Sequence, residues 1–272
     1  MSTVPLPLSR TNKAAMEIAT TAALKAGQLL SEKFSIIKTF QSKGRGNVVS
    51  EADFAAEKIL KQILTDQYPD FGIISEESEA VKGKAEYQWI IDPLDGSRNY
   101  VSGVPHFAVN IALVRGEEIL LGLTYDPSRK EIFTSVKGNG AYLNGKQVWV
   151  GKATSLKDSL VGLDMGYNDA RGKDALNLLT GLWPGMQSIR IMGSAALGLA
   201  YVASGRLDIY FHHNLYPWDV APGILMIQEA GGLITDRDGN PMSYEFGNLI
   251  AANKAVHNDF LCLTEGSAWR KA

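Results

Sequence analysis

One short stretch constrains this chain more than any other: residues 89–100, which read WIIDPLDGSRNY. The apolar residues at its start are typical of the end of a buried strand. We expect that strand to stop at Asp92, because Pro93 has no amide hydrogen for further ladder pairing. Asp95 follows three positions after Asp92, so two carboxylates lie close together at the end of a strand.

Two neighbouring acids behind a buried strand need a positive partner. Burial of a carboxylate is unfavourable without a counter-charge, and like charges disfavour joint ionisation. A divalent cation would satisfy both Asp92 and Asp95. The stretch therefore predicts a site that holds Mg²⁺ and presents it to a phosphate.

The composition is that of a globular protein without a strong charge bias. The chain has 272 residues, 45% hydrophobic and 21% charged, and its 27 basic and 29 acidic residues give a net charge of -2. This balance does not favour nucleic-acid binding, and no apolar run reaches the roughly 18 residues of a membrane span. The single cysteine, Cys262, excludes an internal disulfide and a Cys-rich zinc site. We expect a cytoplasmic protein with one large domain or two closely packed ones.

The order of predicted elements divides the chain into two halves. We expect helices at about residues 13–34 and 50–68, followed by strands that meander through residues 71–150 in antiparallel pairing. Beyond that point strands and helices alternate, which indicates a more parallel, layered arrangement. The sequence thus predicts an N-terminal α+β half (1–152) with the metal-binding stretch, and a C-terminal α/β half (153–272) that completes the site.

Other acidic residues are placed where they could join Asp92 and Asp95. Glu76 directly follows a short apolar run, so it would emerge beside Asp92 if the two strands were neighbours. Asp219 lies at the start of a predicted helix. Carboxylate oxygens suit Mg²⁺, Mn²⁺ or Ca²⁺ and not zinc, and the backbone carbonyl of Leu94 could add a further hard ligand.

The residues directly after the two acids are suited to phosphate chemistry. Gly96 and Ser97 lie where a loop becomes a helix, and free amides at a helix N-terminus attract phosphate oxygens. The Ser97 hydroxyl would lie beside the metal. Asp53 could accept a hydrogen bond from it and so help to orient a water molecule for attack.

The other candidates also have simple structural interpretations as helix caps, dipole partners or solvated surface. These candidates are Asp53 with Ser50, Asp219, Glu76 with Glu77, and Gly193 with Ser194. A strand-end Asp-Pro-x-Asp-Gly has little structural use, so the metal hypothesis depends mainly on Asp92 and Asp95.

Taken together and in order, these elements resemble the inositol monophosphatase family. Residues 89–97 and 218–232 resemble the two signatures of the family. Residues 75–78 resemble its Gly-Glu-Glu-Ser element, and residues 49–53 its Val-Thr-x-x-Asp element. Residues 193–196 are similar to the segment beside the substrate. Five elements in the right order and spacing are far more specific than any one of them.

The resemblance implies a layered αβαβα sandwich, usually dimeric, that hydrolyses phosphomonoesters with two to three Mg²⁺ per site, or with Mn²⁺, and is inhibited by Li⁺. By position, Glu76, Asp92 and the Leu94 carbonyl would hold the first metal. Asp92, Asp95 and Asp219 would hold the second. Glu76 would also face a third, weaker metal. Ser97 and Asp53 would activate the attacking water. The phosphate and the rest of the substrate would contact Asp95, Gly96, Ser97, Gly193, Ser194, Ala195, His212 and Asp219.

Three positions depart from the family pattern, and the last of them questions inositol as the substrate while leaving the phosphatase chemistry intact. Ser97 replaces the usual threonine and keeps its hydroxyl, and Arg98 replaces a common second threonine. His212 stands where inositol-specific members carry a glutamate that binds sugar hydroxyls. We therefore expect a phosphatase of small polyol or sugar phosphates that resemble inositol 1-phosphate, with histidinol phosphate, fructose 1,6-bisphosphate or 3′-phosphoadenosine 5′-phosphate as alternative substrates.

Two hypotheses outside this class remain. A non-catalytic member acting as a binding or regulatory subunit would be marked by loss of a metal ligand, and none is lost. A metal-dependent nuclease would need a basic groove, which the net charge of -2 does not favour. The partners we expect are a small phosphomonoester and a second copy of the chain, without nucleic acid or membrane.

Overall fold

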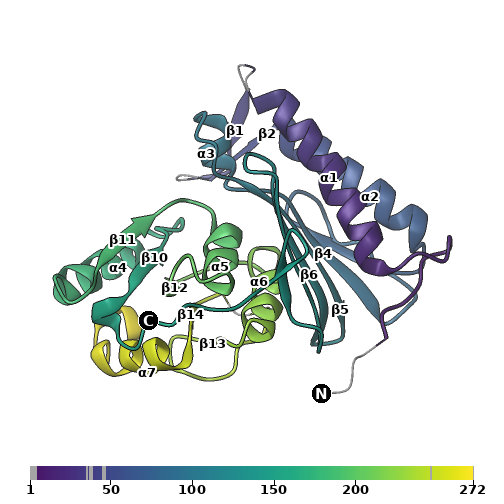
Figure 1. Cartoon of the computed structure of the whole chain (residues 1–272). Helices are drawn as coiled ribbons and strands as arrows, with labels where there is room; N and C mark the ends of the chain where they lie inside the picture. The colour runs from purple at the N-terminus through teal and green to yellow at the C-terminus, as the bar shows by residue number, and fades with distance from the viewer. Residues whose placement is uncertain (1–4, 35, 37–38, 45–46, 246, 272) are drawn as a thin grey trace.

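The chain forms five stacked layers that alternate between helices and sheets (Figure 1). The computed structural model describes residues 5–34, 36, 39–44, 47–245 and 247–271. Its helices are α1 (Ala15–Phe34), α2 (Glu51–Gln67), α3 (Ser97–Val101), α4 (Asp169–Leu182), α5 (Ala195–Ala203), α6 (Pro217–Glu229) and α7 (Lys254–Leu263), with short 3₁₀ turns at Leu156–Asp158 and Ala268–Lys271. None of these helices is long and apolar enough to cross a membrane.

The first sheet belongs to the N-terminal half, and its strands lie in chain order. In the described residues these strands are β3 (Gly72–Ser75), β4 (Tyr87–Asp95), β5 (Ala108–Arg115), β6 (Glu118–Asp126), β7 (Glu131–Val136), β8 (Ala141–Leu143) and β9 (Lys146–Val148). All neighbouring pairs are antiparallel except β3 and β4, which run parallel. The predicted antiparallel meander is therefore confirmed from β4 onward.

The second sheet belongs to the C-terminal half and is mixed. Its spatial order is β11 (Ser188–Ile191), β10 (Leu160–Leu163), β12 (Ile209–His212), β14 (Leu249–Ala252) and β13 (Leu233–Thr235). Strand β10 pairs in parallel with β11 and β12, whereas β14 is antiparallel to both of its neighbours. The expected parallel arrangement thus holds for three strands only. A loop without a crossover helix joins β13 to β14, and such a connection favours antiparallel pairing.

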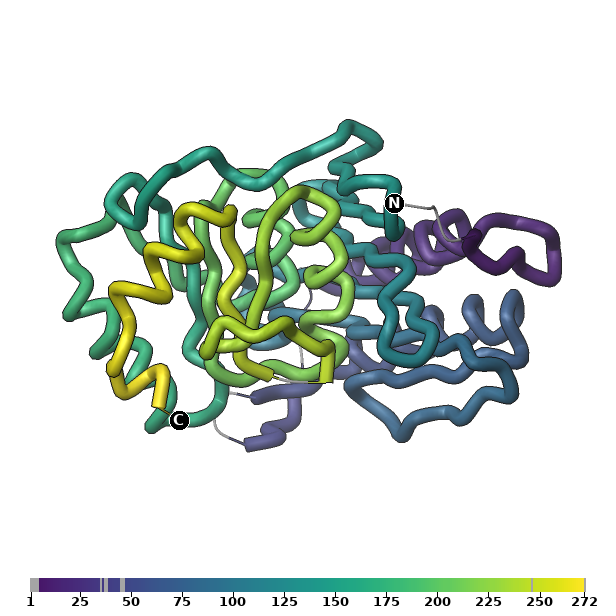
Figure 2. Tube along the Cα trace, turned by 90° about the horizontal axis from the view of Figure 1, so that it is seen from below, coloured from purple at the N-terminus to yellow at the C-terminus, as the bar shows by residue number. Residues whose placement is uncertain are grey.

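Helices fill the space between the sheets and cover their outer faces. Figure 1 shows α1 and α2 along one face of the first sheet, α5 and α6 between the two sheets, and α4 and α7 on the far side of the second sheet. Figure 2, in a perpendicular view, places the N-terminal helices at one end of the molecule and α7 at the other. This is the layered αβαβα sandwich that the sequence predicts. The division into halves at residues 152 and 153 falls between the two sheets, and as a domain boundary it stays a prediction.

The central helix α6 is buried on all sides because it lies between two sheets. Residues 220–227 of this helix are all buried. The helix approaches β6 so closely that a Cβ atom on Gly122 would lie 2.6 Å from the carbonyl oxygen of Pro222. Only glycine permits that approach. The contact fixes the start of α6, and with it Asp219, against the first sheet.

The end of β4 differs from the prediction. The strand continues past Pro93 to Asp95, with a register shift after Asp92: Asp92 pairs with Asn110, and Asp95 pairs with Ala108. The expectation that Pro93 ends the strand is therefore wrong. A proline is tolerated within a sheet at a bulge, where the ladder skips a residue and no amide hydrogen is needed.

A small hairpin of β1 (Phe40–Ser42) and β2 (Val48–Ser50) precedes α2 and was not expected from the sequence. The sequence predicts a flexible basic loop at residues 43–46, between these strands. Residues 45 and 46 of that loop lie outside the described part of the chain. Lys43, which is described, reaches the site discussed below.

Candidate active site

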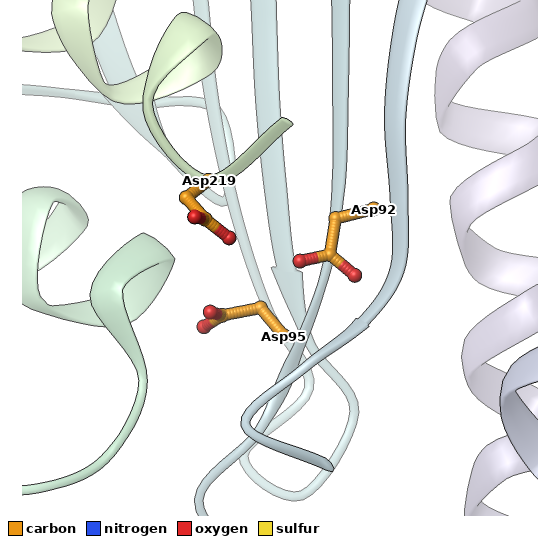
Figure 3. Close-up of side chains that lie close together, drawn as sticks. All are labelled: Asp92, Asp95 and Asp219. Carbon is orange, nitrogen blue, oxygen red and sulfur yellow. The ribbon is translucent and has the colours of Figure 1, made fainter. Parts of the chain in front are cut away.

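Three carboxylates from two distant parts of the chain lie close together (Figure 3). Asp92 and Asp95 come from β4 and Asp219 from the first turn of α6, and each offers an oxygen within 4.8 Å of the others. In a regular strand, residues three apart point to opposite faces. The bulge between Asp92 and Asp95 inserts one residue, and so brings both side chains to the same side.

The cluster is strongly acidic, and no Lys or Arg among the described residues forms an ion pair with its three carboxylates. Burial, followed by the neighbouring carboxylates, raises the pKa of Asp92 and of Asp219 well above their ordinary value. Burial raises the pKa of Asp95 to about 7, against the opposing effect of the Ser194 hydroxyl that donates to it. Each of these shifts means that the folded protein resists placing negative charge at this point.

A cation fits this cluster. One oxygen of Asp92 accepts a hydrogen bond from the Leu94 amide at 2.9 Å, whereas the other, Oδ2, is buried and has no hydrogen-bond partner among the described residues. A buried carboxylate oxygen without a donor is unfavourable unless a cation binds it. The donor set of carboxylates with a nearby carbonyl is that of Mg²⁺, Mn²⁺ or Ca²⁺.

Glu76 lies beside Asp92, as the sequence predicts. Strands β3 and β4 are parallel neighbours with Ser75 opposite Ile91, so the residues that follow emerge at the same edge. Glu76 is not one of the three mutually close carboxylates, but Asp92 experiences its charge. Burial raises the pKa of Glu76, and the Lys43 ammonium, 3.6 Å away, opposes that rise.

Glu77 is held next to Glu76 and is not solvated surface. Only 1% of its side chain is exposed, and it forms an ion pair with Lys43 at 2.5 Å. Burial, with the charge of Glu76, raises the pKa of Glu77 to about 7. The β1–β2 hairpin thus supplies a cation to this acidic pair, which the sequence did not reveal, because Lys43 lies more than 30 positions away in the chain.

Asp53 makes the hydrogen bonds that both of its interpretations require. Its Oδ2 accepts the Ser50 amide at 2.8 Å and so completes the capping box of α2. Its Oδ1 accepts a hydrogen bond from the Ser97 hydroxyl at 2.8 Å. The structural and the functional interpretation are therefore compatible, because each uses a different oxygen.

The Ser97 hydroxyl lies between two acceptors. It is 2.8 Å from Asp53 Oδ1 and 2.8 Å from the Leu94 carbonyl oxygen, and its single proton serves one of them at a time. If the Leu94 carbonyl bound a cation, the proton would go to Asp53. Burial raises the pKa of Asp53, which favours a proton there.

A cavity of about 300 Å³ adjoins the carboxylates and extends toward the C-terminal half. Its lining includes the candidates Asp95, Gly96, Gly193, Ser194, Ala195, His212 and Asp219, together with Arg98, Asp164, Tyr167 and Tyr216. The cavity lining thus contains seven of the eight predicted substrate residues, and the eighth, Ser97, does not line it. Ser194 also caps α5, since its hydroxyl accepts the Leu197 amide at 3.3 Å.

His212 faces this cavity as a neutral hydrogen-bond donor. Burial, followed by the neighbouring His213, lowers the pKa of His212 to about 3. Its Nδ1 accepts the Asn214 amide at 3.1 Å, so in the neutral ring the proton is on Nε2. The neutral His212 ring thus offers a hydrogen-bond donor, whereas the glutamate expected here in inositol-specific members would offer an acceptor.

Asp164 and Asn99 also belong to the site and were not predicted. Asp164 lines the cavity and is 7% exposed. It directly follows the predicted strand at residues 160–163, which is the same signal that identified Asp92. Asn99 lies within the opening stretch, but its contact with Gly193 depends on long-range folding.

Comparison with known proteins agrees with this geometry. The sequence model of the inositol monophosphatase family matches residues 12–267. The chain is 38% identical over 253 residues to the inositol-1-monophosphatase of Mesorhizobium japonicum, covering 91% of this chain and 95% of that protein. It is 37% identical over 251 residues to the fructose-1,6-bisphosphatase/inositol-1-monophosphatase of Aquifex aeolicus, covering 90% and 93%.

A solved structure shares the fold. The extragenic suppressor protein SuhB from Bartonella henselae superposes with a TM-score of 0.89 and 36% identity, covering 92% of this chain and 98% of that one. The family match extends over nearly the whole chain and includes every segment that forms the carboxylate cluster and the cavity. The chain therefore belongs to the inositol monophosphatase family and is a phosphatase.

Proposed function

We propose that this protein is a Mg²⁺-dependent hydrolase of phosphomonoesters of small polyols or sugars. The observation that carries the proposal is the cluster of Asp92, Asp95 and Asp219, in which a buried oxygen of Asp92 has no hydrogen-bond partner in the described part of the chain. The cavity beside the cluster has a volume of about 300 Å³, which lies at the lower end of the range for small-molecule sites. Mn²⁺ would suit the same oxygen ligands.

The metal ligands come from the predicted residues. Glu76, Asp92 and the Leu94 carbonyl would hold one ion, Asp92, Asp95 and Asp219 a second, and Glu76 would face a weaker third. Bound Mg²⁺ would polarise the phosphoryl group and neutralise the charge that develops on it. Inhibition by Li⁺, which the family resemblance implies, is part of the proposal.

Ser97 and Asp53 would orient and deprotonate the attacking water. A lone pair of the Ser97 hydroxyl can accept a hydrogen bond from water while its proton is donated to Asp53, 2.8 Å away. The proton lost by the water would then pass through Ser97 to Asp53. Burial of Asp53, which raises its pKa, favours that transfer. Gly96 and Ser97 would donate backbone amides to the phosphate.

His212 bears on the choice among substrates. As a neutral donor, its Nε2–H would bind an acceptor on the substrate, such as a hydroxyl oxygen or a second phosphate. The Mesorhizobium relative is named for inositol 1-phosphate hydrolysis, and the Aquifex relative for fructose 1,6-bisphosphate as well. Inositol 1-phosphate and fructose 1,6-bisphosphate are therefore the first substrates to compare, with histidinol phosphate and 3′-phosphoadenosine 5′-phosphate as further alternatives.

The cellular setting is also a proposal. We infer a homodimer in the cytoplasm, without nucleic-acid or membrane partners, from the family resemblance and the single cysteine. A purely regulatory role is disfavoured, since every predicted metal ligand is present and three of them converge. Light scattering of the purified chain tests the dimer.

The decisive experiment measures phosphate release from this panel of substrates, with and without Mg²⁺ and Li⁺. Hydrolysis should require Mg²⁺ and should be inhibited by Li⁺. Ser97→Thr keeps the hydroxyl and should retain activity, whereas Ser97→Ala should lower kcat by about 10²–10⁴-fold, as expected for loss of general-base assistance. If no phosphomonoester is hydrolysed in the presence of Mg²⁺, the proposed function is wrong.

A further inference from the structure

A backbone turn at Met192 and Gly193 forms one wall of the cavity and is held by a buried carboxylate. Asp164 Oδ1 accepts the amides of Met192 at 2.8 Å and Gly193 at 2.5 Å. Its Oδ2 accepts the Tyr210 hydroxyl at 2.8 Å. Both oxygens of Asp164 are therefore occupied by donors from this chain, and the residue is 7% exposed.

The parallel strands explain why these groups meet. Strands β10 and β11 are parallel with Leu163 opposite Ile191, so Asp164 and Met192 leave the sheet side by side. Tyr210 lies on β12, the other parallel neighbour of β10. In open sheets, ligands bind beyond the carboxyl ends of parallel strands. Asp164 stands at that edge, and each of its two oxygens accepts a hydrogen bond from the protein.

The same turn is held from the opposite half of the molecule. Asn99 Nδ2, on α3, lies 2.7 Å from the carbonyl oxygen of Met192 and 3.1 Å from that of Gly193. Asp164 therefore binds the amides of the turn while Asn99 binds its carbonyls. A backbone fixed on both sides has little freedom to move.

The turn leads directly to the carboxylate cluster. Ser194, the next residue, donates its hydroxyl to Asp95 Oδ2, and the Ala196 amide donates to the same oxygen at 3.2 Å. A shift of the turn would therefore remove both donors from Asp95. The contacts thus run from Asp164 through the turn to Asp95, which belongs to the carboxylate cluster and also lines the cavity.

We propose that Asp164 is a positioning residue for the hydrolysis of the phosphomonoester: it anchors the Met192–Gly193 turn, and the turn fixes Asp95 and the wall of the substrate cavity. The inference rests on the proposed function for the reaction, but the anchoring of the turn can be measured without it. The role assigned to Asp164 is exerted through the turn, because its Oδ1 accepts two amides of the turn and its Oδ2 accepts the Tyr210 hydroxyl.

The test compares three variants by steady-state kinetics and by hydrogen exchange. Asp164→Ala removes the anchor. Asp164→Asn keeps an oxygen that can accept both amides. Asp208→Ala is the matched control, because Asp208 Oδ2 accepts the Leu160 amide at 2.8 Å at the other end of the same strand. Substrate KM, kcat and the exchange of amides in residues 192–197 are measured for each folded variant.

We expect Asp164→Ala to raise KM by about tenfold or more and to lower kcat/KM by up to about 100-fold, as a misplacement of about 1 Å can do. The amides of Met192 and Gly193 should exchange about tenfold faster, since they lose their acceptor, and those of residues 194–197 should exchange faster as the turn loosens. Asp164→Asn should stay within about threefold of wild type in KM because the amide hydrogen bonds can be kept. Asp208→Ala should leave KM unchanged even where it lowers stability.

Three results would overturn the inference. They are a wild-type KM and wild-type exchange in Asp164→Ala, an equal rise of KM in Asp208→Ala, or an Asp164→Asn variant as impaired as Asp164→Ala. A wild-type protein that hydrolyses no phosphomonoester would refute the proposed function instead. The exchange rates alone would then decide whether Asp164 anchors the turn.

Discussion

Asp92 is the residue on which the site depends most. It is buried, the charges of Glu76, Asp95 and Asp219 act on it, and one of its oxygens has no partner in the described chain. In the absence of metal, such a group lowers stability, because burial disfavours its charged form. The same unfavourable arrangement makes a cation bind strongly.

Replacement of Asp92 by Asn should therefore separate stability from activity. We expect activity with Mg²⁺ to fall by at least about 100-fold, because a metal ligand is lost. The melting temperature of the metal-free protein should rise by about 2–4 °C, the effect of about 1 kcal/mol in a chain of this size. Phosphate release and thermal denaturation measure the two effects.

The control is Asp66→Asn, a substitution of an exposed aspartate on α2 that should change neither quantity. An Asp92→Asn variant with wild-type activity would show that the metal assignment is wrong. A metal-free variant less stable than wild type would contradict the electrostatic argument.

The start of α3 lies between the carboxylate cluster and the cavity. Gly96 caps this helix with φ +85°, a backbone conformation that glycine adopts readily and other residues do not. A Cβ atom here would lie 3.0 Å from the His106 carbonyl oxygen and 3.1 Å from that of Gly193. Gly96 is therefore restricted both by its backbone conformation and by the neighbouring carbonyl groups. Its conformation also places the next residue, Ser97, beside Asp53.

Gly96→Ala should lower both stability and activity. We expect a loss of about 1–3 kcal/mol in the free energy of unfolding, the range for a strained backbone conformation. Because the side chain would also displace the Gly193 carbonyl, kcat/KM should fall. Denaturant unfolding and steady-state kinetics give the two values.

Gly103→Ala is the matched control for this substitution. Gly103 has φ +77°, but no atom lies within 4 Å of the position its Cβ would take. It should lose stability from the backbone alone and keep its kcat/KM. Equal losses of activity in both variants would mean that crowding at Gly96 has no role in the site.

The pH dependence of stability reflects the two opposite kinds of buried titratable group in the folded chain. The pKa of Asp95 is raised to about 7 in the folded chain, whereas an aspartate in the unfolded chain has a pKa of about 4. Its contribution to the free energy of unfolding is therefore fully present below pH 4 and is lost as the pH rises through 7. Lowered pKa values, about 3 for His212 and about 4 for His106, give stability that is present above about 6.5 and is lost as pH falls. The two trends oppose one another in the metal-free protein.

A comparison with and without Mg²⁺ should isolate the contribution of the carboxylates to the pH dependence of stability. The histidines contribute equally to both measurements. At pH 5 the ion must displace protons from the cluster, whereas at pH 7.5 it relieves repulsion between charges. We expect the rise in melting temperature produced by Mg²⁺ to be larger at pH 7.5 than at pH 5. An increment that is equal at both pH values would contradict the raised pKa values of the cluster.

Local sequence predicted much of this protein, because the relevant signals are short. The apolar runs before Glu76 and Asp92 identified β3 and β4, and their parallel pairing placed the two acids at one edge. The Ser50–Asp53 spacing identified the start of α2, and the segment after Trp218 the start of α6. The choice of candidate metal ligands follows from oxygen chemistry and from the family motifs, each of which is contiguous in the chain.

Only the tertiary structure decided how these groups meet. The bulge after Asp92 depends on pairing with Asn110 and Ala108, and without it Asp92 and Asp95 would point to opposite faces. The approach of Asp219 depends on the packing of α6 against β6. Lys43 and Asp164 act through contacts that join distant parts of the chain. Sequence determines which groups are available because their chemistry is local, whereas their distances are set by long-range packing that no local pattern records.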